Sequence, residues 1–301
     1  MRVGLIGVGH VGASVAMSLL QGGVVRELLL HDHDAARAEG EAMDLAHGAP
    51  FYPNAQVRSA ALEPVLNADV VVFAAGRNGR PGESRLELLA DNRRVAADLG
   101  SQLAGCAGVV VVVSNPVDVL TRVLQDASGL PAARVLGTGT MLDTARLRER
   151  LAHRLGVDAR SIHAQVLGEH GDSEFVHWSA AQVGGRPLRD WPGWTAADED
   201  SIGHAVRTAA AQIIQRKGVT NHAIGLVTAD LVRAIVRNER RVLTVSRAQA
   251  SLGGVALSLP AVVGSGGAAT VIDPRLDAGG RAALQTSAAT LQRAWAGAAA
   301  A

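Results

Sequence analysis

Residues 2–20, RVGLIGVGHVGASVAMSLL, predict how the first half of the chain folds. The run from Arg2 to Val8 has the apolar character of a buried strand, and residues 13–20 have the composition of a helix. The intervening turn, Gly7-Val8-Gly9-His10-Val11-Gly12, has glycines where a sharp bend, a close approach to a pyrophosphate and tight helix-on-strand packing require them. We therefore expect a dinucleotide to be bound by Gly7, Gly9, Val11 and Gly12.

A second apolar run, Leu28-Leu29-Leu30, supports this interpretation because it ends in His31-Asp32. Dinucleotide-binding folds carry an acid for the ribose hydroxyls about 20 residues after the glycine turn. Asp32 would also repel a 2′-phosphate, so we expect NAD rather than NADP as the cofactor. His31-Asp32-His33-Asp34 has residue types that bind metals, but alternation along an extended end would point Asp32 away from both histidines. We therefore predict no metal site.

Two further strands are predicted at residues 69–75 and 109–113, and the second is five valines in succession, as in a parallel sheet covered on both faces. Residues 76–85 between them contain three arginines together with glycine and proline. This loop is predicted to be a lid over an anionic substrate, and the alternative is an ordinary surface connection. Gly76 and Asn115 follow the two strands, at the edge where open parallel sheets bind ligands, and are expected to contact the cofactor.

The composition is that of a soluble globular protein of 301 residues, with 48% hydrophobic and 19% charged residues. The net charge of +1 gives no general reason to expect nucleic acid, and no apolar run is long enough to suggest a membrane partner. Cys106 is the only cysteine, and the N-terminus lacks a signal-peptide pattern, so we expect a cytoplasmic protein. The length predicts two domains, residues 1–140 and 141–301.

The second half has mixed helical and strand character, which predicts an α+β domain. Ile202, Val206, Ala209 and Ile213 are spaced as one face of a helix that ends near Gly218 and packs on a core. Residues 241–247 and 255–259 are predicted to form a hairpin, and residues 277–300 a terminal helix. The fold class is therefore α/β, a Rossmann-type doubly wound parallel sheet with a second α+β domain.

The most distinctive stretch of the second half is Val166-Leu167-Gly168-Glu169-His170-Gly171-Asp172. Glycines on either side of His170 permit a tight turn and the approach of a small substrate, and imidazole exchanges a proton near neutral pH. Judged locally, an ordinary loop histidine is the better interpretation. Asp143 and Arg146 likewise have the spacing of a surface i,i+3 ion pair.

Taken together, these segments resemble the L-lactate and malate dehydrogenase family from one end of the chain to the other. The motifs that carry the resemblance are Gly7-x-Gly9-x-x-Gly12, Asp32, Pro81-Gly82-Glu83-Ser84-Arg85, Ser114-Asn115-Pro116-Val117-Asp118, Gly137-Thr138-Gly139-Thr140-Met141-Leu142-Asp143-Thr144-Ala145-Arg146 and Leu167-Gly168-Glu169-His170-Gly171-Asp172.

The resemblance implies hydride transfer between a nicotinamide and C2 of a 2-oxo or 2-hydroxy acid, and it implies a role for each of four residues. His170 would give and take the proton, and Asp143 would orient it. Arg146 would bind the substrate carboxylate through two parallel hydrogen bonds, and Arg85 would polarise the reacting carbonyl. Asn115 would contact both substrate and cofactor.

Glu83 and Thr220 resemble the lactate branch of the family, whereas Gly79 departs from it. Gly79 occupies a substrate-binding position at which lactate enzymes have glutamine and malate enzymes arginine, and Asn221-His222 also differs from the usual aromatic pair. The resemblance therefore implies pyruvate and L-lactate as substrates. The alternatives are malate or a broader range of L-2-hydroxy acids. A methyltransferase or a non-catalytic NAD-binding regulator would share the glycine turn but would not need Asp143, Arg146 and His170.

Arg148 and His163 match positions that resemble the sugar-bisphosphate site of allosteric bacterial lactate dehydrogenases. The resemblance implies a homotetramer in which these groups face their counterparts across a two-fold axis, with fructose 1,6-bisphosphate as a possible effector. The alternative is that Arg148 is a solvated helix residue and His163 a core histidine.

Overall fold

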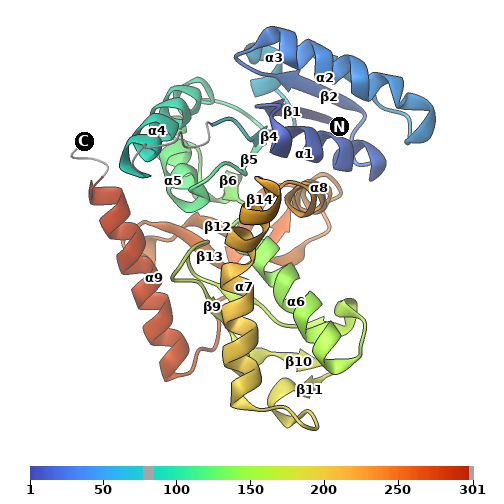
Figure 1. Cartoon of the computed structure of the whole chain (residues 1–301). Helices are drawn as coiled ribbons and strands as arrows, with labels where there is room; N and C mark the ends of the chain where they lie inside the picture. The colour runs from blue at the N-terminus through green and yellow to red at the C-terminus, as the bar shows by residue number, and fades with distance from the viewer. Residues whose placement is uncertain (77–84, 298–301) are drawn as a thin grey trace.

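The computed structural model of the chain describes residues 1–76 and 85–297, and the side chains of residues 85–87 lie outside that description. In these ranges the main element is a nine-stranded sheet with the order β14-β13-β12-β6-β5-β4-β1-β2-β3 (Figure 1). Its parallel part comprises β1 Arg2–Ile6, β2 Glu27–His31, β3 Gln56–Ser59, β4 Val70–Phe73, β5 Val109–Val112 and β6 Val135–Gly137. Its antiparallel part comprises β12 Arg241–Ala248, β13 Ala256–Gly264 and β14 Gly267–Val271.

Helices cover both faces of the sheet and fill the second half of the molecule. The helices in the described ranges are α1 His10–Gln21, α2 Ala35–His47, α3 Leu62–Leu66, α4 Arg85–Gln102, α5 Val117–Ser128, α6 Met141–Leu155, α7 Ala196–Lys217, α8 His222–Val236 and α9 Ala278–Gly297. Short 3₁₀ turns lie at Ala49–Phe51, Ala132–Arg134, Ala159–Ser161, Trp178–Ala180, Leu188–Asp190 and Ala250–Leu252. The second half also contains the short strands β7 Ile162–His163, β8 Val166–Leu167, β9 Phe175–Val176, β10 Gln182–Val183 and β11 Arg186–Pro187.

The central strands are apolar throughout because both of their faces are buried. Val70 and Val72 of β4 point into one core with α1, α2 and α8, whereas Val71 and Phe73 point into another with α4, α5 and α9. This arrangement confirms the predicted parallel sheet, whose strands 3-2-1-4-5-6 are in the doubly wound order. None of the helices formed by residues 1–76 and 85–297 is long and apolar enough to cross a lipid bilayer.

The second half has a smaller core of its own between α6, α7 and the short strands. Ile202 and Val206 of α7 lie in it, and α7 ends before Gly218 as predicted. The predicted apolar face of α7 is wrong at its C-terminal end, because Ile213 is 37% exposed. Only the N-terminal part of this helix therefore packs on the core.

The predicted hairpin does not stay within the second half. Strand β12 pairs with β6 through Ser246 and Gly137, so the hairpin and the additional strand β14 extend the sheet of the first half. At this junction a Cβ atom on Gly137 would lie 2.5 Å from Thr121 Oγ1 and 3.0 Å from Ser246 Cβ. The absence of a side chain at Gly137 therefore lets α5 and β12 pack directly against β6.

We predict that Gly137→Ala lowers the free energy of unfolding by about 1–3 kcal/mol, because the added methyl group has no space. The matched control is Gly40→Ala in α2, where a Cβ atom would meet nothing within 4 Å and should stabilise the helix. Urea unfolding of both variants at equal protein concentration measures the difference. An unchanged midpoint for Gly137→Ala would show that the junction tolerates a side chain.

Candidate active site

Two glycines of the turn allow close backbone packing, and the third leaves open space beside the N-terminus of α1. Gly7 has φ +92°, and a Cβ atom on it would lie 2.6 Å from Ala75 Cα; a Cβ atom on Gly12 would lie 2.0 Å from Gly7 O. Both glycines are therefore required by the fold. At Gly9 a Cβ atom would meet nothing within 4 Å, and no side chain of the described residues caps the N-terminus of α1. Open space beside free helix N–H groups suits a pyrophosphate, while Val11 packs partly into the core.

Asp32 lies beside this turn, just after β2, and is 8% exposed. Its Oδ2 accepts a hydrogen bond from Val8 N at 2.9 Å, and its Oδ1 accepts one from Asp34 N at 3.1 Å. Burial opposes the charge, but these hydrogen bonds and His33 lower the pKa of Asp32. The prediction that Asp32 points away from both histidines is wrong for His33, whose Nδ1 lies 2.7 Å from Asp32 Oδ1. The chain bends after Asp32 because Asp34 caps α2, so strand alternation does not continue.

The ends of β4 and β5 lie close together at the same edge of the sheet. Ser114 Oγ donates to Ala75 O at 2.6 Å, which links the segments that carry Gly76 and Asn115. Asn115 lies between β5 and α5, and its Oδ1 accepts a hydrogen bond from Val117 N at 3.3 Å. The predicted cofactor residues Gly7, Gly9, Gly12, Asp32, Gly76 and Asn115 thus follow β1, β2, β4 and β5, whose carboxyl ends form one edge.

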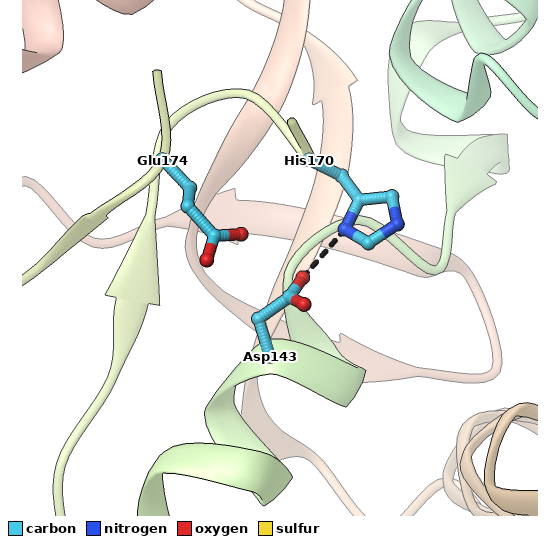
Figure 2. Close-up of side chains that lie close together, drawn as sticks. All are labelled: Asp143, His170 and Glu174. Atoms are coloured by element: carbon cyan, nitrogen blue, oxygen red, sulfur yellow. Dashed lines mark hydrogen bonds and ion pairs between the residues drawn. The ribbon is translucent and has the colours of Figure 1, made fainter. Parts of the chain in front are cut away.

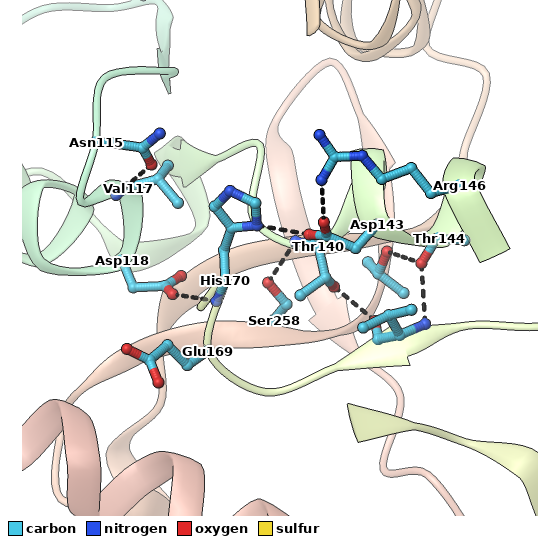
Figure 3. Close-up of polar contacts among 12 residues, drawn as sticks. Asn115, Val117, Asp118, Thr140, Asp143, Thr144, Arg146, Glu169, His170 and Ser258 are labelled. Atoms are coloured by element: carbon cyan, nitrogen blue, oxygen red, sulfur yellow. Dashed lines mark hydrogen bonds and ion pairs between the residues drawn. The ribbon is translucent and has the colours of Figure 1, made fainter. Parts of the chain in front are cut away.

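The second group of polar residues centres on Asp143, which is 1% exposed in the first turn of α6. His170 Nδ1 lies 2.5 Å from Asp143 Oδ2, and Arg146 Nη1 donates to Asp143 Oδ1 at 2.8 Å (Figure 3). The structure therefore brings together three of the residues predicted for catalysis and substrate binding. Burial opposes ionisation of Asp143, but His170 and Arg146 outweigh it and lower the pKa of this carboxyl.

Hydrogen bonds to the start of α6 and to β13 hold the segment that leads into the loop of His170. Thr140 Oγ1 donates to Val166 O at 2.6 Å, and Val166 N donates to Thr144 Oγ1 at 3.0 Å, so the start of α6 holds β8. Gly168 and Ser258 exchange two backbone hydrogen bonds of 3.0 and 2.9 Å, which attach the loop to β13. These contacts explain how His170 reaches Asp143 although 27 residues separate them.

Asp118 contacts the backbone of His170 and was assigned no role from the sequence, although it lies within one of the motifs. It follows Asn115 in the first turn of α5, is 2% exposed, and accepts a hydrogen bond from His170 N at 2.7 Å. Burial raises the pKa of Asp118 to about 6, so the group is still mainly ionised at neutral pH. Its place three residues after the predicted cofactor residue Asn115 was the available signal.

Glu174 is a second residue that sequence reasoning missed (Figure 2). It is 6% exposed, and one ligand atom each of Glu174, Asp143 and His170 lie within 4.8 Å of one another. Such spacing can accommodate a metal ion, but Arg146 donates to Asp143 and its positive charge opposes a cation there. In the sequence, an acid four residues after His170 in a polar loop is expected to be exposed. Glu174 was therefore not predicted to be part of the site.

The acidic groups around His170 control its protonation. Burial disfavours the imidazolium, but Asp143, with smaller contributions from Asp118 and Glu174, outweighs burial and raises the pKa of His170 to about 9. Because Asp143 occupies Nδ1, Nε2 is the ring nitrogen left to face a substrate. The arrangement can therefore store and deliver one proton at neutral pH.

Other predicted residues lie apart from this hydrogen-bonded group or outside the description. Residues 77–84, which include Gly79, Glu83 and most of the predicted lid, are not described, and of Arg85 only its place at the start of α4 is known. Thr220 is half-buried in the connection between α7 and α8. The next residue, Asn221, donates to Ser14 Oγ of α1 at 2.9 Å, which holds this connection against the helix of the glycine turn.

Arg148 and His163 lie away from the substrate-facing residues. Arg148 is half-buried, its Nε donates to Ala164 O at 3.2 Å, and it lines a cavity of about 550 Å³ with Arg160, Arg233 and Arg241. His163 lies in β7 and is exposed. The exposure of His163 does not fit the alternative of a core histidine, whereas Arg148 is only partly solvated.

Comparisons with known proteins agree with this geometry. Residues 1–137 match the NAD-binding domain of lactate/malate dehydrogenases, and residues 140–300 match their α/β C-terminal domain. The chain is 44% identical over 299 residues to the L-lactate dehydrogenase of Synechococcus sp. (strain JA-3-3Ab), covering 97% of this chain and 98% of that one. It is also 44% identical over 302 residues to the L-lactate dehydrogenase of Thermus aquaticus, covering 97% of each.

Solved structures show the same fold along the whole chain. The minor L-lactate dehydrogenase from Enterococcus mundtii, in its ligand-bound form, has a TM-score of 0.95 at 37% identity and covers 98% of this chain and 97% of its own. A lactate dehydrogenase from a Medee basin deep-sea metagenome library also has a TM-score of 0.95 at 37% identity, covering 99% and 98%. NAD is thereby confirmed as the cofactor, and the chain belongs to the lactate/malate dehydrogenase family of NAD-dependent oxidoreductases.

Proposed function

We propose that the chain is an NAD-dependent L-lactate dehydrogenase that interconverts pyruvate and L-lactate. Residues 1–140 hold the cofactor in this proposal, and residues 141–301 supply the proton donor and the substrate-binding arginine. The observation that carries it is the pairing of His170 and Arg146 with the buried Asp143, because it joins a proton store to a carboxylate-binding cation. The relatives named L-lactate dehydrogenase favour pyruvate over the other 2-oxo acids.

Bound NAD supplies or accepts the hydride, and the chain's own residues manage charge and protons. His170 donates the proton from Nε2 to the ketone oxygen while Asp143 holds Nδ1 and stabilises the imidazolium. Arg146 uses one N–H on Asp143, so its remaining N–H groups are available for the substrate carboxylate. Arg85, at the start of α4, is assigned to polarising the ketone, and Asn115 to contacting substrate and cofactor.

Malate and a broader range of L-2-hydroxy acids are the alternatives that Gly79 raised by departing from the lactate pattern, and the relatives named L-lactate dehydrogenase do not favour them. A non-catalytic NAD-binding regulator is disfavoured by the buried charge of Asp143 and its pairing with the partly buried His170. Keeping such charges out of water is costly unless they are paired, and a protein that only binds NAD has no use for them.

The test of the proposed function is NADH oxidation with a panel of pyruvate, oxaloacetate, 2-oxobutyrate and phenylpyruvate. We expect pyruvate to give the highest kcat/KM. His170→Ala should lower it by about 10²–10⁴-fold while NADH binding is retained, because only proton transfer is lost. A higher kcat/KM with oxaloacetate would favour the malate alternative, and a near-normal rate for His170→Ala would contradict the mechanism.

The cofactor preference has a separate test at Asp32. Replacing it with serine should increase the use of NADPH relative to NADH, because the charge that repels a 2′-phosphate is removed. The measurement is kcat/KM for both cofactors with pyruvate. An unchanged ratio would place the ribose away from Asp32.

We propose further that the protein is cytoplasmic and self-associates, with a homotetramer as the expected form. Large apolar side chains remain exposed on this single chain, among them Met17, Leu226 and Val242. Leu226 and Val242 line the same 550 Å³ cavity as Arg148. Exposed apolar groups around a cavity rich in arginine are consistent with a surface that meets another subunit and an anion.

Fructose 1,6-bisphosphate is the effector that we propose for Arg148 and His163, by resemblance to allosteric bacterial enzymes. We expect it to lower the apparent KM for pyruvate with a coupling energy of about 1–3 kcal/mol, and Arg148→Gln should abolish this activation. Arg150→Gln, an exposed arginine two residues further along α6, is the matched control. Superimposable saturation curves of the parent with and without the bisphosphate would rule out the site.

A further inference from the structure

Glu174 is the buried ionisable group near His170 that the proposed mechanism does not use. It lies directly before β9, and its carboxylate points toward Asp143 (Figure 2). No residue in the part of the chain that the structure describes donates a hydrogen bond to this carboxylate; only its backbone N–H is paired, with Gly171 O at 3.1 Å. A buried carboxylate that accepts no hydrogen bond is destabilised when it is charged. The charge state of Glu174 therefore depends on the charged groups around it.

Charged groups from three elements face Glu174. They are Asp143 and Arg146 of α6, Arg207 of α7, and His170 of the loop between β8 and β9. Burial is the main cause that raises the pKa of Glu174 to about 8; Asp143 adds to it, whereas His170 and the two arginines oppose it. Glu174 therefore carries a proton at neutral pH and becomes charged in mildly alkaline solution.

Ionisation of Glu174 has a consequence for His170. His170 is faced by Asp143, Asp118 and Glu174, and all three acids raise the pKa of its imidazole. When Glu174 loses its proton in alkaline solution, it places a negative charge beside the imidazole. That charge makes the imidazolium proton harder to remove.

We propose that Glu174 is a positioning residue for the proton on His170: its carboxylate, within 4.8 Å of the imidazole and of Asp143, extends the pH range over which His170 remains a proton donor. This inference rests on the proposed function, because it requires that His170 deliver a proton to a 2-oxo acid. It assigns Glu174 no contact with the substrate. The group acts only through the charge that it places beside the imidazole.

The test is the pH dependence of pyruvate reduction by Glu174→Gln, which keeps the side chain's size but cannot ionise. Removing a negative charge near His170 lowers the pKa of the imidazole, so the alkaline limb of kcat/KM should move to lower pH by about one unit. The plateau at lower pH should change by only a few-fold. Binding of oxamate, an isosteric pyruvate analogue, to the NADH complex should lose affinity over the same shifted range.

Asp172→Asn is the matched control, because it removes the same charge from an exposed position two residues away. Glu174→Asp keeps the charge on a shorter side chain, so its alkaline limb should lie between those of the parent and Glu174→Gln. This variant also decides the matter if Glu174→Gln does not fold, as judged by circular dichroism.

The inference is overturned if the parent reduces pyruvate but Glu174→Gln, or Glu174→Asp in its place, keeps the parental alkaline limb. It is also overturned if Asp172→Asn moves the limb as far as Glu174→Gln does. A parent enzyme that reduces none of the 2-oxo acids would instead refute the proposed function. The two failures are therefore distinguishable.

Discussion

Burial of the Asp143 carboxylate is the constraint on which the rest of the site depends. An isolated charge with 1% exposure would cost several kcal/mol, so both of its oxygens must be paired. His170 and Arg146 provide this pairing, and it also fixes which imidazole nitrogen is left for chemistry. Removing either partner would leave one oxygen of a buried carboxylate unpaired, so the contacts that stabilise this region are also those that the proposed proton transfer uses.

The main sheet is continuous between the two halves of the chain. This continuity positions Asp143, His170 and Arg146 relative to the sheet edge where the predicted cofactor residues lie. Strand β12 pairs with β6 of the parallel sheet, β13 pairs with β12, and Ser258 of β13 pairs with Gly168 next to the catalytic loop. Asp118 provides a second link, because it binds His170 N from the helix that begins just after Asn115. The proposed proton donor is therefore attached by backbone and side chain to the elements that carry the proposed cofactor residues.

The elements that depend on neighbouring residues in the sequence could be predicted from it. The strands, the glycine turn and Asp32 follow from apolar runs and spacing, and the structure has them at the expected edge of the sheet. The pairing of His170 with Asp143 required the family resemblance, since no periodicity connects residues 27 apart. The extension of the sheet by β12 was not predicted, because a single residue pair joins β12 to β6. The burial of Glu174 was not predicted either, because an acid in a loop is usually exposed.

The described part of the site also shows where substrate specificity can change. His170, Asp143, Arg146 and Asp118 are fixed on helices and on a loop bonded to a strand, so each is constrained by several contacts. Thr220 belongs to the connection between α7 and α8, and among the described residues no hydrogen bond or ion pair joins it to Asp143, His170 or Arg146. A substitution at such a position can alter the fit of the substrate's side chain without disturbing a buried charge. Substrate preference and proton chemistry can therefore change independently in this enzyme.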